Sequence, residues 1–261
     1  SDAAAAVGAI LDARLPELPA SRRRDLWMML DRLRRRARAA DDSVVLVPLF
    51  VGADAQTAVQ AELTDGEARV YAGAKDLWLL QPDDAAEYEG IDDCRAAVRF
   101  AATEDAFYAS IVVDDDIHFN DADSADNLHQ GDSAILIIDA DGSGGLFPNA
   151  TDIEIHAGLS QRTADVFYIA YSPLPPAGDA ADSVRAVVRR EGTRTVYQFR
   201  IAWSRLDVKP GGDASFRATV VVNDRDSASG APVLLGTYGN HLDFRMPEYF
   251  PAVKLLKKEQ R

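Results

Sequence analysis

The sequence predicts an all-β protein, an antiparallel β-sandwich of the jelly-roll kind, with a helical extension at its N-terminus. Three observations lead to this fold class. Short apolar runs recur from residue 44 onward, Gly, Pro and Asp separate them, and no second strong helix follows the one predicted in residues 21–40. We therefore divide the chain into an N-terminal helical extension, residues 1–43, and a β-sandwich domain, residues 44–261.

The extension contains one amphipathic, basic segment. Ser21 is suited to cap a helix, and one apolar stripe follows at helical spacing, made of Leu26, Met29, Leu30, Leu33 and Ala37. Eight Arg against two Asp give residues 21–40 a charge of +6, which leaves −20 for the rest of a chain whose net charge is −14. We interpret the segment as a helix that packs on the acidic body or joins a neighbouring domain. The alternative is a basic surface for a membrane or a polyanion.

An acidic loop between two apolar strand regions is the central feature of the body. Alternating apolar residues predict a strand pair over 95–113, which ends at the carboxylates of residues 114–116 because three adjacent charges cannot share a dry interior. The loop then reaches residues 131–133 and a strand over 134–139 that is apolar on both faces. Further strands are predicted at 44–50, 67–71, 76–80, 153–159, 166–171, 184–190, 196–203, 215–223, 233–238 and 252–255.

Composition and motifs favour a binding module over an enzyme. The chain has no Gly-x-Ser-x-Gly motif, and its four His residues lack the spacing of a zinc site. An acidic body argues against nucleic-acid binding, and no apolar run approaches the ~20 residues of a membrane span. Cys94 is the only cysteine, so no disulfide can form within the chain.

Two short acidic motifs are candidate calcium sites. Asp139 and Asp141 lie in an Asp-Ala-Asp-Gly turn, and Asp224 and Asp226 follow a predicted strand in an Asn-Asp-Arg-Asp sequence. Carboxylate oxygens are the hard ligands that Ca²⁺ prefers. The alternative is that both are ordinary Asp-rich turns whose carboxylates accept hydrogen bonds from backbone donors, and the residues alone leave both open.

The order of the motifs over roughly residues 91–256 resembles the family 9 carbohydrate-binding modules, which belong to the DOMON-like β-sandwiches. Four pieces carry the resemblance: the strand pair from Val98 to Asp115, the Gly-Asp-Ser strand that ends at Asp139, the segment 197–206 around Trp203, and the strand 216–226 together with the closing segment 250–255. The resemblance implies a non-catalytic sugar-binding module. It also implies attachment to a secreted glycoside hydrolase that acts on xylan or a related polysaccharide, with an extracellular or periplasmic location.

The same resemblance places the candidate site residues. The family clamps a sugar ring between two Trp residues, and His129 and Phe244 stand at those two positions here. We add Glu154 and Tyr238 as further candidate sugar contacts. The resemblance also implies structural calcium, for which the candidate ligands are Asp139, Asp141, Asp224 and Asp226.

Two other functions are compatible with the sequence. Replacement of both Trp residues, together with the basic helix, favours a structural or interaction sandwich that docks on a catalytic domain in the same or a longer chain. A haem-binding DOMON-type domain is the other alternative, with Met246 and either His156 or His241 as candidate axial ligands.

Overall fold

The computed structural model describes residues 44–71, 90, 92–144, 149, 151–171, 183–211, 215–230, 233–236, 247 and 250–258. The predicted N-terminal extension, including its basic helix, and the predicted strand at 76–80 lie outside these residues. The helices are α3 (Ala55–Asp65), the 3₁₀ helix η4 (Ala125–Gln130) and α5 (Trp203–Leu206). The strands are β1 (Val44–Phe50), β2 (Arg69–Tyr71), β3 (Cys94–Thr103), β4 (Ala106–Asp115), β5 (Ser133–Asp139), β6 (Ile153–Gly158), β7 (Phe167–Tyr171), β8 (Val184–Glu191), β9 (Arg194–Ala202), β10 (Ser215–Asp224), β11 (Val233–Gly236) and β12 (Ala252–Lys258).

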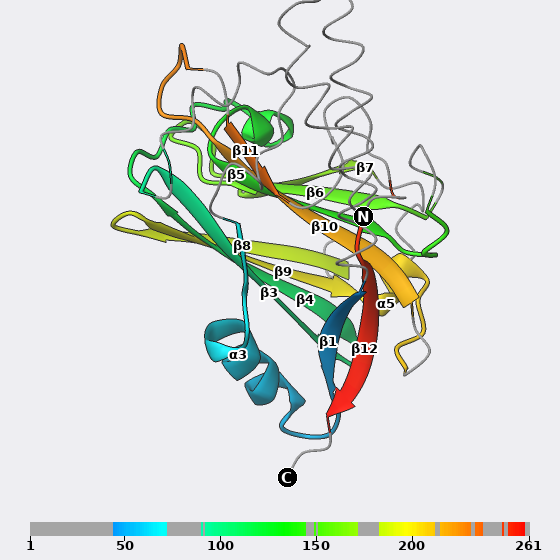
Figure 1. The fold of residues 1–261 in the computed structure, drawn as a ribbon. Helices are drawn as coiled ribbons and strands as arrows, with labels where there is room; N and C mark the ends of the chain where they lie inside the picture. The colour runs from blue at the N-terminus through cyan, green and yellow to red at the C-terminus, as the bar shows by residue number, and fades with distance from the viewer. Residues whose placement is uncertain are drawn as a thin grey trace, which may run out of the picture.

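The strands form the predicted β-sandwich, which confirms the fold class. They are hydrogen-bonded in the order β7-β6-β5-β10-β12-β1-β3-β4-β9-β8, with β11 added beside β10 and β2 beside β3. The first four strands of this order, β7, β6, β5 and β10, form one layer. They lie over the last four, β3, β4, β9 and β8, and β12 and β1 connect the two layers (Figure 1). The sandwich is therefore one continuous sheet folded on itself.

Both layers contribute to one apolar core. Phe107 of β4 and Phe216 of β10 come from opposite layers, and their rings meet edge to face at 5.2 Å between centroids. Trp203 packs against both rings and donates a hydrogen bond from Nε1 to the carbonyl oxygen of Thr103 at 2.8 Å. The indole is thus buried with its one polar group satisfied, as a core tryptophan requires.

Strand β1 departs from the antiparallel pattern that the sequence predicts. It pairs in parallel with β12 along its whole length and in parallel with β3 at Leu49 and Phe50 only. The other strand pairs among the described residues are antiparallel. Because β1 and β12 are far apart in the sequence, no tight hairpin connects them, and a parallel arrangement is open to them.

Helix α3 is a second difference, since the sequence gives no strong helix after residue 43. Its buried residues are only Ala55, Val59 and Leu63, so its apolar stripe is one residue wide and gives a weak helical pattern. These side chains form a small second core with Phe50, Ala101, Ala106 and Tyr108 on the outer face of the sheet. Tertiary packing, rather than local pattern, stabilises this helix.

Candidate functional site

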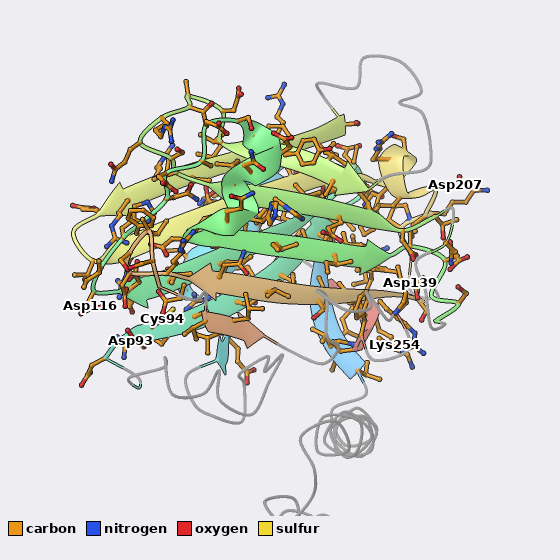
Figure 2. The ribbon with its side chains drawn as sticks, turned by 90° about the horizontal axis from the view of Figure 1, so that it is seen from above. Asp93, Cys94, Asp116, Asp139, Asp207 and Lys254 are labelled. Carbon is orange, nitrogen blue, oxygen red and sulfur yellow. The ribbon has the colours of Figure 1, made fainter. Side chains whose placement is uncertain are left out.

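Four strand ends meet at one end of the sandwich and bring their carboxylates together. Pairing of Cys94 with Asp115 brings the start of β3 beside the end of β4, and pairing of Ser133 with Asn223 does the same for β5 and β10. Figure 2 shows Asp93, Cys94 and Asp116 at this end and Asp139 at the opposite end. We call the resulting group the acidic end cluster: Asp93, Asp115, Asp116, His118, Asp132, Asp224 and Asp226.

Asp132 is the most densely bonded member of the acidic end cluster. One carboxylate oxygen, Oδ2, accepts the backbone N–H of Phe119 at 2.7 Å, and the other, Oδ1, accepts that of Arg225 at 2.7 Å. His118 Nδ1 lies 2.9 Å from the same Oδ2. The carboxylate is only 3 % exposed, so these contacts replace its hydration.

The ring of His118 faces acceptors on both sides. Its Nε2 contacts the carbonyl oxygen of Leu159 at 3.0 Å while Nδ1 faces Asp132. Burial alone lowers the pKa of His118, but these two hydrogen-bonding partners outweigh burial and raise it. The geometry therefore favours the doubly protonated ring, which makes His118 a cationic partner of Asp132 rather than a neutral metal ligand.

The remaining carboxylates of the cluster lie close together, and Asp115 and Asp224 among them are buried. Asp115 has one cationic contact, from Arg190 Nη1 at 3.0 Å. Asp224 is 3 % exposed, and its Oδ1 has no hydrogen-bond partner among the described residues. Burial, with repulsion from neighbouring carboxylates, raises the pKa of Asp115 to about 7 and that of Asp224 to about 9. In the absence of a cation, the cluster holds protons that isolated carboxylates would release.

The acidic end cluster fits a hard divalent cation. Three sets of its members each bring one ligand atom per residue within 4.8 Å of the others: Asp115, Asp224 and Asp226; Asp93, Asp116 and Asp226; and Asp115, His118 and Asp132. The first set is made of carboxylates alone and contains the buried oxygen of Asp224 that lacks a partner. Oxygen ligands without sulfur or neutral imidazole are typical of calcium rather than zinc.

The predicted pair Asp139 and Asp141 lies at the other end of β5, and the structure adds Asp152 to it. Asp139 Oδ2 accepts the N–H of Gly144 at 2.9 Å, and Asp152 Oδ2 accepts that of Asn149 at 2.8 Å. Burial first, and then nearby carboxylates, raise the pKa of Asp139 to about 6 and that of Asp152 to about 7. No three ligand atoms of this group fall within 4.8 Å of one another among the described residues, so the group matches a metal site less closely than the acidic end cluster does.

A row of aromatic and acidic side chains lies on the outer face of β6 and β7, beside η4. The ring of His129, on η4, meets that of His156 edge to face at 5.3 Å between centroids, and His156 meets Tyr168 in the same way at 6.4 Å. His156 Nε2 lies 2.5 Å from Glu154 Oε1. We call these four residues the histidine row.

The structure describes two of the four sugar contacts that the sequence predicts. His129 and Glu154 both belong to the histidine row, but they are joined through His156, which the sequence did not assign to a sugar site. Glu154 is 1 % exposed, so its carboxylate orients His156 rather than facing solvent. Phe244 and Tyr238 lie outside the described residues, as do the proposed haem ligands Met246 and His241.

Sequence reasoning missed several members of both groups. Asp93, Asp115 and Asp132 were not predicted as ligands, because they come from three different strand ends that only the fold brings together. His156 and Tyr168 lie on two paired strands. Each alternates with a residue on the core side, the buried Ile155 and the partly buried Ile169, and this alternation was the available signal in the sequence.

These observations define the class: a carboxylate-rich β-sandwich that carries rings and buried polar groups on one outer face. Solved structures share this fold. A family 9 carbohydrate-binding module from Caldicellulosiruptor kristjanssonii in complex with cellotriose aligns over 83 % of this chain and 96 % of its own length, with a TM-score of 0.56 and 15 % identity. The same module in complex with glucose aligns over 83 % and 98 % with equal TM-score and identity. A putative carbohydrate-binding protein from Bacteroides uniformis covers 82 % of this chain and 99 % of itself, at a TM-score of 0.53 and 10 % identity.

The fold is thus that of the family 9 carbohydrate-binding modules, and the resemblance predicted from the sequence is confirmed at the level of fold. No family model and no curated protein matches the sequence. Among the described residues, no helix is both long and apolar enough to span a membrane.

The raised pKa values predict how the stability of the chelator-treated protein depends on pH. Asp115 and Asp224 bind protons more tightly when folded, so the folded state holds more protons than the unfolded state between pH ~4 and their folded pKa values of about 7 and about 9. The free energy of unfolding should therefore fall by about 6 kcal/mol as the pH rises from 5 to 8. Urea unfolding in the presence of a chelator measures this free energy at each pH. Asp224→Asn should make it depend less on pH. A free energy of unfolding that rises between pH 5 and 8 would contradict the raised pKa values of Asp115 and Asp224.

Proposed function

We propose that this chain is a non-catalytic carbohydrate-binding module that holds its sugar at the histidine row. The observation that carries the proposal is the cluster of His129, His156 and Tyr168 rings on one outer face of a fold whose solved examples include modules in complex with glucose and cellotriose. Rings supply flat apolar area, and their nitrogen and hydroxyl groups supply the few oriented polar contacts that a sugar requires.

The contacts of the histidine row suit this role. The His129 ring is fixed by a hydrogen bond between its Nδ1 and the carbonyl oxygen of Asp126 at 2.9 Å, so it is held in one orientation. Glu154 contacts Nε2 of His156 and fixes its ring. His156 is only 5 % exposed, while Tyr168 is 38 % exposed. A sugar would then meet His129 and Tyr168 at the surface, with Phe244 and Tyr238 as further candidates from the sequence. Preorganised rings lower the entropy lost on binding.

The proposal also covers the enzyme that this module would assist and its location, both of which follow from the family resemblance. A module of this kind would serve as an accessory to a polysaccharide-degrading glycoside hydrolase that acts on xylan or a related glycan. It would be located outside the cytoplasm, in the extracellular space or the periplasm. An attached catalytic domain would supply the hydrolysis, because the described residues of this chain are assigned to binding and to structure.

Isothermal titration calorimetry of the whole chain against glucose, cellotriose and xylo-oligosaccharides tests the sugar site. His129→Ala and Phe244→Ala should each lower the affinity at least tenfold, because His129 belongs to the histidine row and Phe244 stands at the second Trp position that the family resemblance gives. Gln198→Ala, on β9 in the opposite layer, is the matched control and should leave the affinity unchanged. Absence of heat with every sugar at millimolar concentration would reject the proposal in favour of an interaction sandwich.

We propose in addition that the acidic end cluster binds a structural calcium ion through Asp115, Asp224 and Asp226. The observation that favours it is the buried Asp224 oxygen, which has no hydrogen-bond partner among the described residues; burial, and then repulsion from neighbouring carboxylates, raises the pKa of Asp224 to about 9. A bound divalent cation would add positive charge beside Asp224 and would allow its carboxylate to ionise at neutral pH. Asp139 and Asp141, with Asp152, form the second candidate group.

Calcium titration after chelation distinguishes the two groups. Asp224→Asn keeps the shape of the side chain but removes its charge, and it should weaken calcium binding at least tenfold. Asp141→Asn, at an exposed position of the second candidate group at the opposite end of β5, tests that group separately and should bind calcium as the unaltered chain does. Loss of binding in Asp141→Asn with retention in Asp224→Asn would overturn the assignment.

A further inference from the structure

The two-stranded ribbon of β1 and β12 turns a mainly apolar face to solvent, on which the exposed Lys254 stands opposite Leu46. Val44 is 38 % exposed, Leu46 58 % and Leu256 47 %, which makes three of the six exposed large hydrophobic side chains among the described residues members of this one ribbon. Leu256 pairs with Pro48, two residues along β1 from Leu46, so Leu46, Pro48 and Leu256 lie on the same face of the ribbon. Contiguous exposed apolar surface of this kind typically marks an interaction site.

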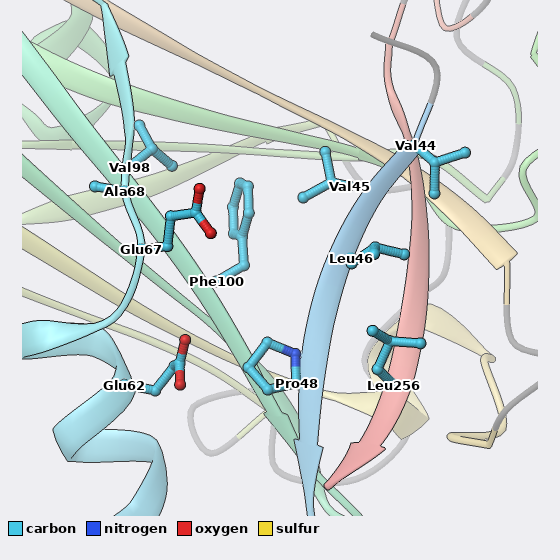
Figure 3. A pocket seen from close by; sticks show the side chains of 10 residues that line it. All are labelled: Val44, Val45, Leu46, Pro48, Glu62, Glu67, Ala68, Val98, Phe100 and Leu256. Atoms are coloured by element: carbon cyan, nitrogen blue, oxygen red, sulfur yellow. The ribbon is translucent and has the colours of Figure 1, made fainter.

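The ribbon face continues into a groove. A cavity of about 310 Å³ lies between β1 and the segment that joins α3 to β2, with Val98 and Phe100 of β3 at its base (Figure 3). The cavity exists because β1 pairs with β3 only at Leu49 and Phe50, so residues 44–48 diverge from β3. Its far wall presents the carboxylates of Glu62 and Glu67, as Figure 3 shows.

The groove therefore has an apolar wall and floor and an acidic rim. An occupant of matching chemistry has an apolar stripe flanked by cations. The chain itself contains such a segment at 21–40, with one apolar stripe and a charge of +6 from eight Arg and two Asp. This segment also has to lie near the groove, because only residues 41–43 separate it from Val44, which lines the groove.

The dimensions agree. As a helix, the stripe from Leu26 to Ala37 would be about 17 Å long at ~1.5 Å per residue. The apolar wall from Val44 to Pro48 is about 13 Å long at ~3.3 Å per residue. The connection from Ala40 to Val44 can reach about 14 Å at ~3.6 Å per residue, which exceeds the ~10 Å that separates packed layers.

We propose that residues 21–40 dock as an amphipathic helix on the ribbon of β1 and β12, antiparallel to β1, with the apolar stripe on Leu46 and Leu256 and arginines toward Glu62 and Glu67. The docked helix removes the exposed apolar face from water and places part of the +6 charge beside an acidic rim. It lies next to α3, which covers the adjoining outer face of β3 and β4. A second copy of the chain or a lipid surface are the other occupants that the experiments below distinguish.

A cross-linking experiment on the full chain tests the docking. Leu33→Cys combined with Leu46→Cys should form an intramolecular disulfide on mild oxidation, with at least five times the yield of the control pair Leu33→Cys and Val187→Cys. Val187 is 43 % exposed on β8, away from the ribbon, and native Cys94 is fully buried and does not compete. Disulfides between two chains, no disulfide, or equal yield in the control pair would each overturn the proposal.

Limited trypsin digestion gives a readout without engineered cysteines. Docking should protect the arginines of residues 22–38, and Leu46→Asp should raise the rate of cleavage within this segment at least fivefold. Val187→Asp places the same charge at an exposed β8 position and should leave the rate unchanged. If trypsin cleaves residues 22–38 at the same rate in the unaltered chain and in Leu46→Asp, the proposal is overturned. Protection that appears only when anionic lipid vesicles are added would overturn it in favour of a lipid surface.

Discussion

The buried carboxylate of Asp132 is the constraint on which one end of the sandwich depends. It accepts backbone N–H groups from Phe119, in the acidic loop, and from Arg225, just after β10, so it joins two segments far apart in the sequence. Burying a charge at this position is costly unless its oxygens are fully bonded, and loss of either backbone donor would remove one of the contacts that replace its hydration. The position of the acidic loop thus depends on this one side chain.

The same network connects the acidic end cluster to the histidine row. Asn223 Nδ2 donates to the carbonyl oxygen of His129 at 3.0 Å, and Arg225 Nη1 donates to that of Gln130 at 2.7 Å. The end of β10 therefore holds the last residues of η4, and η4 carries the His129 ring. In this account, neutralising the carboxylates of the cluster stabilises the end of β10 and, through it, the orientation of the proposed sugar-binding ring.

The local sequence pattern was sufficient to predict most of the strands, but it was insufficient to predict which residues form the acidic end cluster and the histidine row. Alternation and turn residues predict the strands, because each strand buries one or both faces in the core. Helix α3 escaped prediction because three residues spaced by four give almost no pattern, and the parallel position of β1 depends on a partner about 200 residues later. Asp224 and Asp226 could be proposed as ligands from the sequence because they share one motif, whereas Asp115 and Asp132 join them only through strand register. The link from Glu154 through His156 to His129 likewise requires the three-dimensional fold.

Hydrogen exchange of individual amides tests the central claim, that a cation at the acidic end cluster fixes the segments bonded to Asp132. Calcium added to the chelator-treated protein should slow exchange at the N–H groups of Phe119 and Arg225 at least tenfold, because opening at these amides would expose the cation site. The N–H of Phe199, in the core of β9, should change much less. Equal slowing at all three amides, or none at Phe119 and Arg225, would contradict the account.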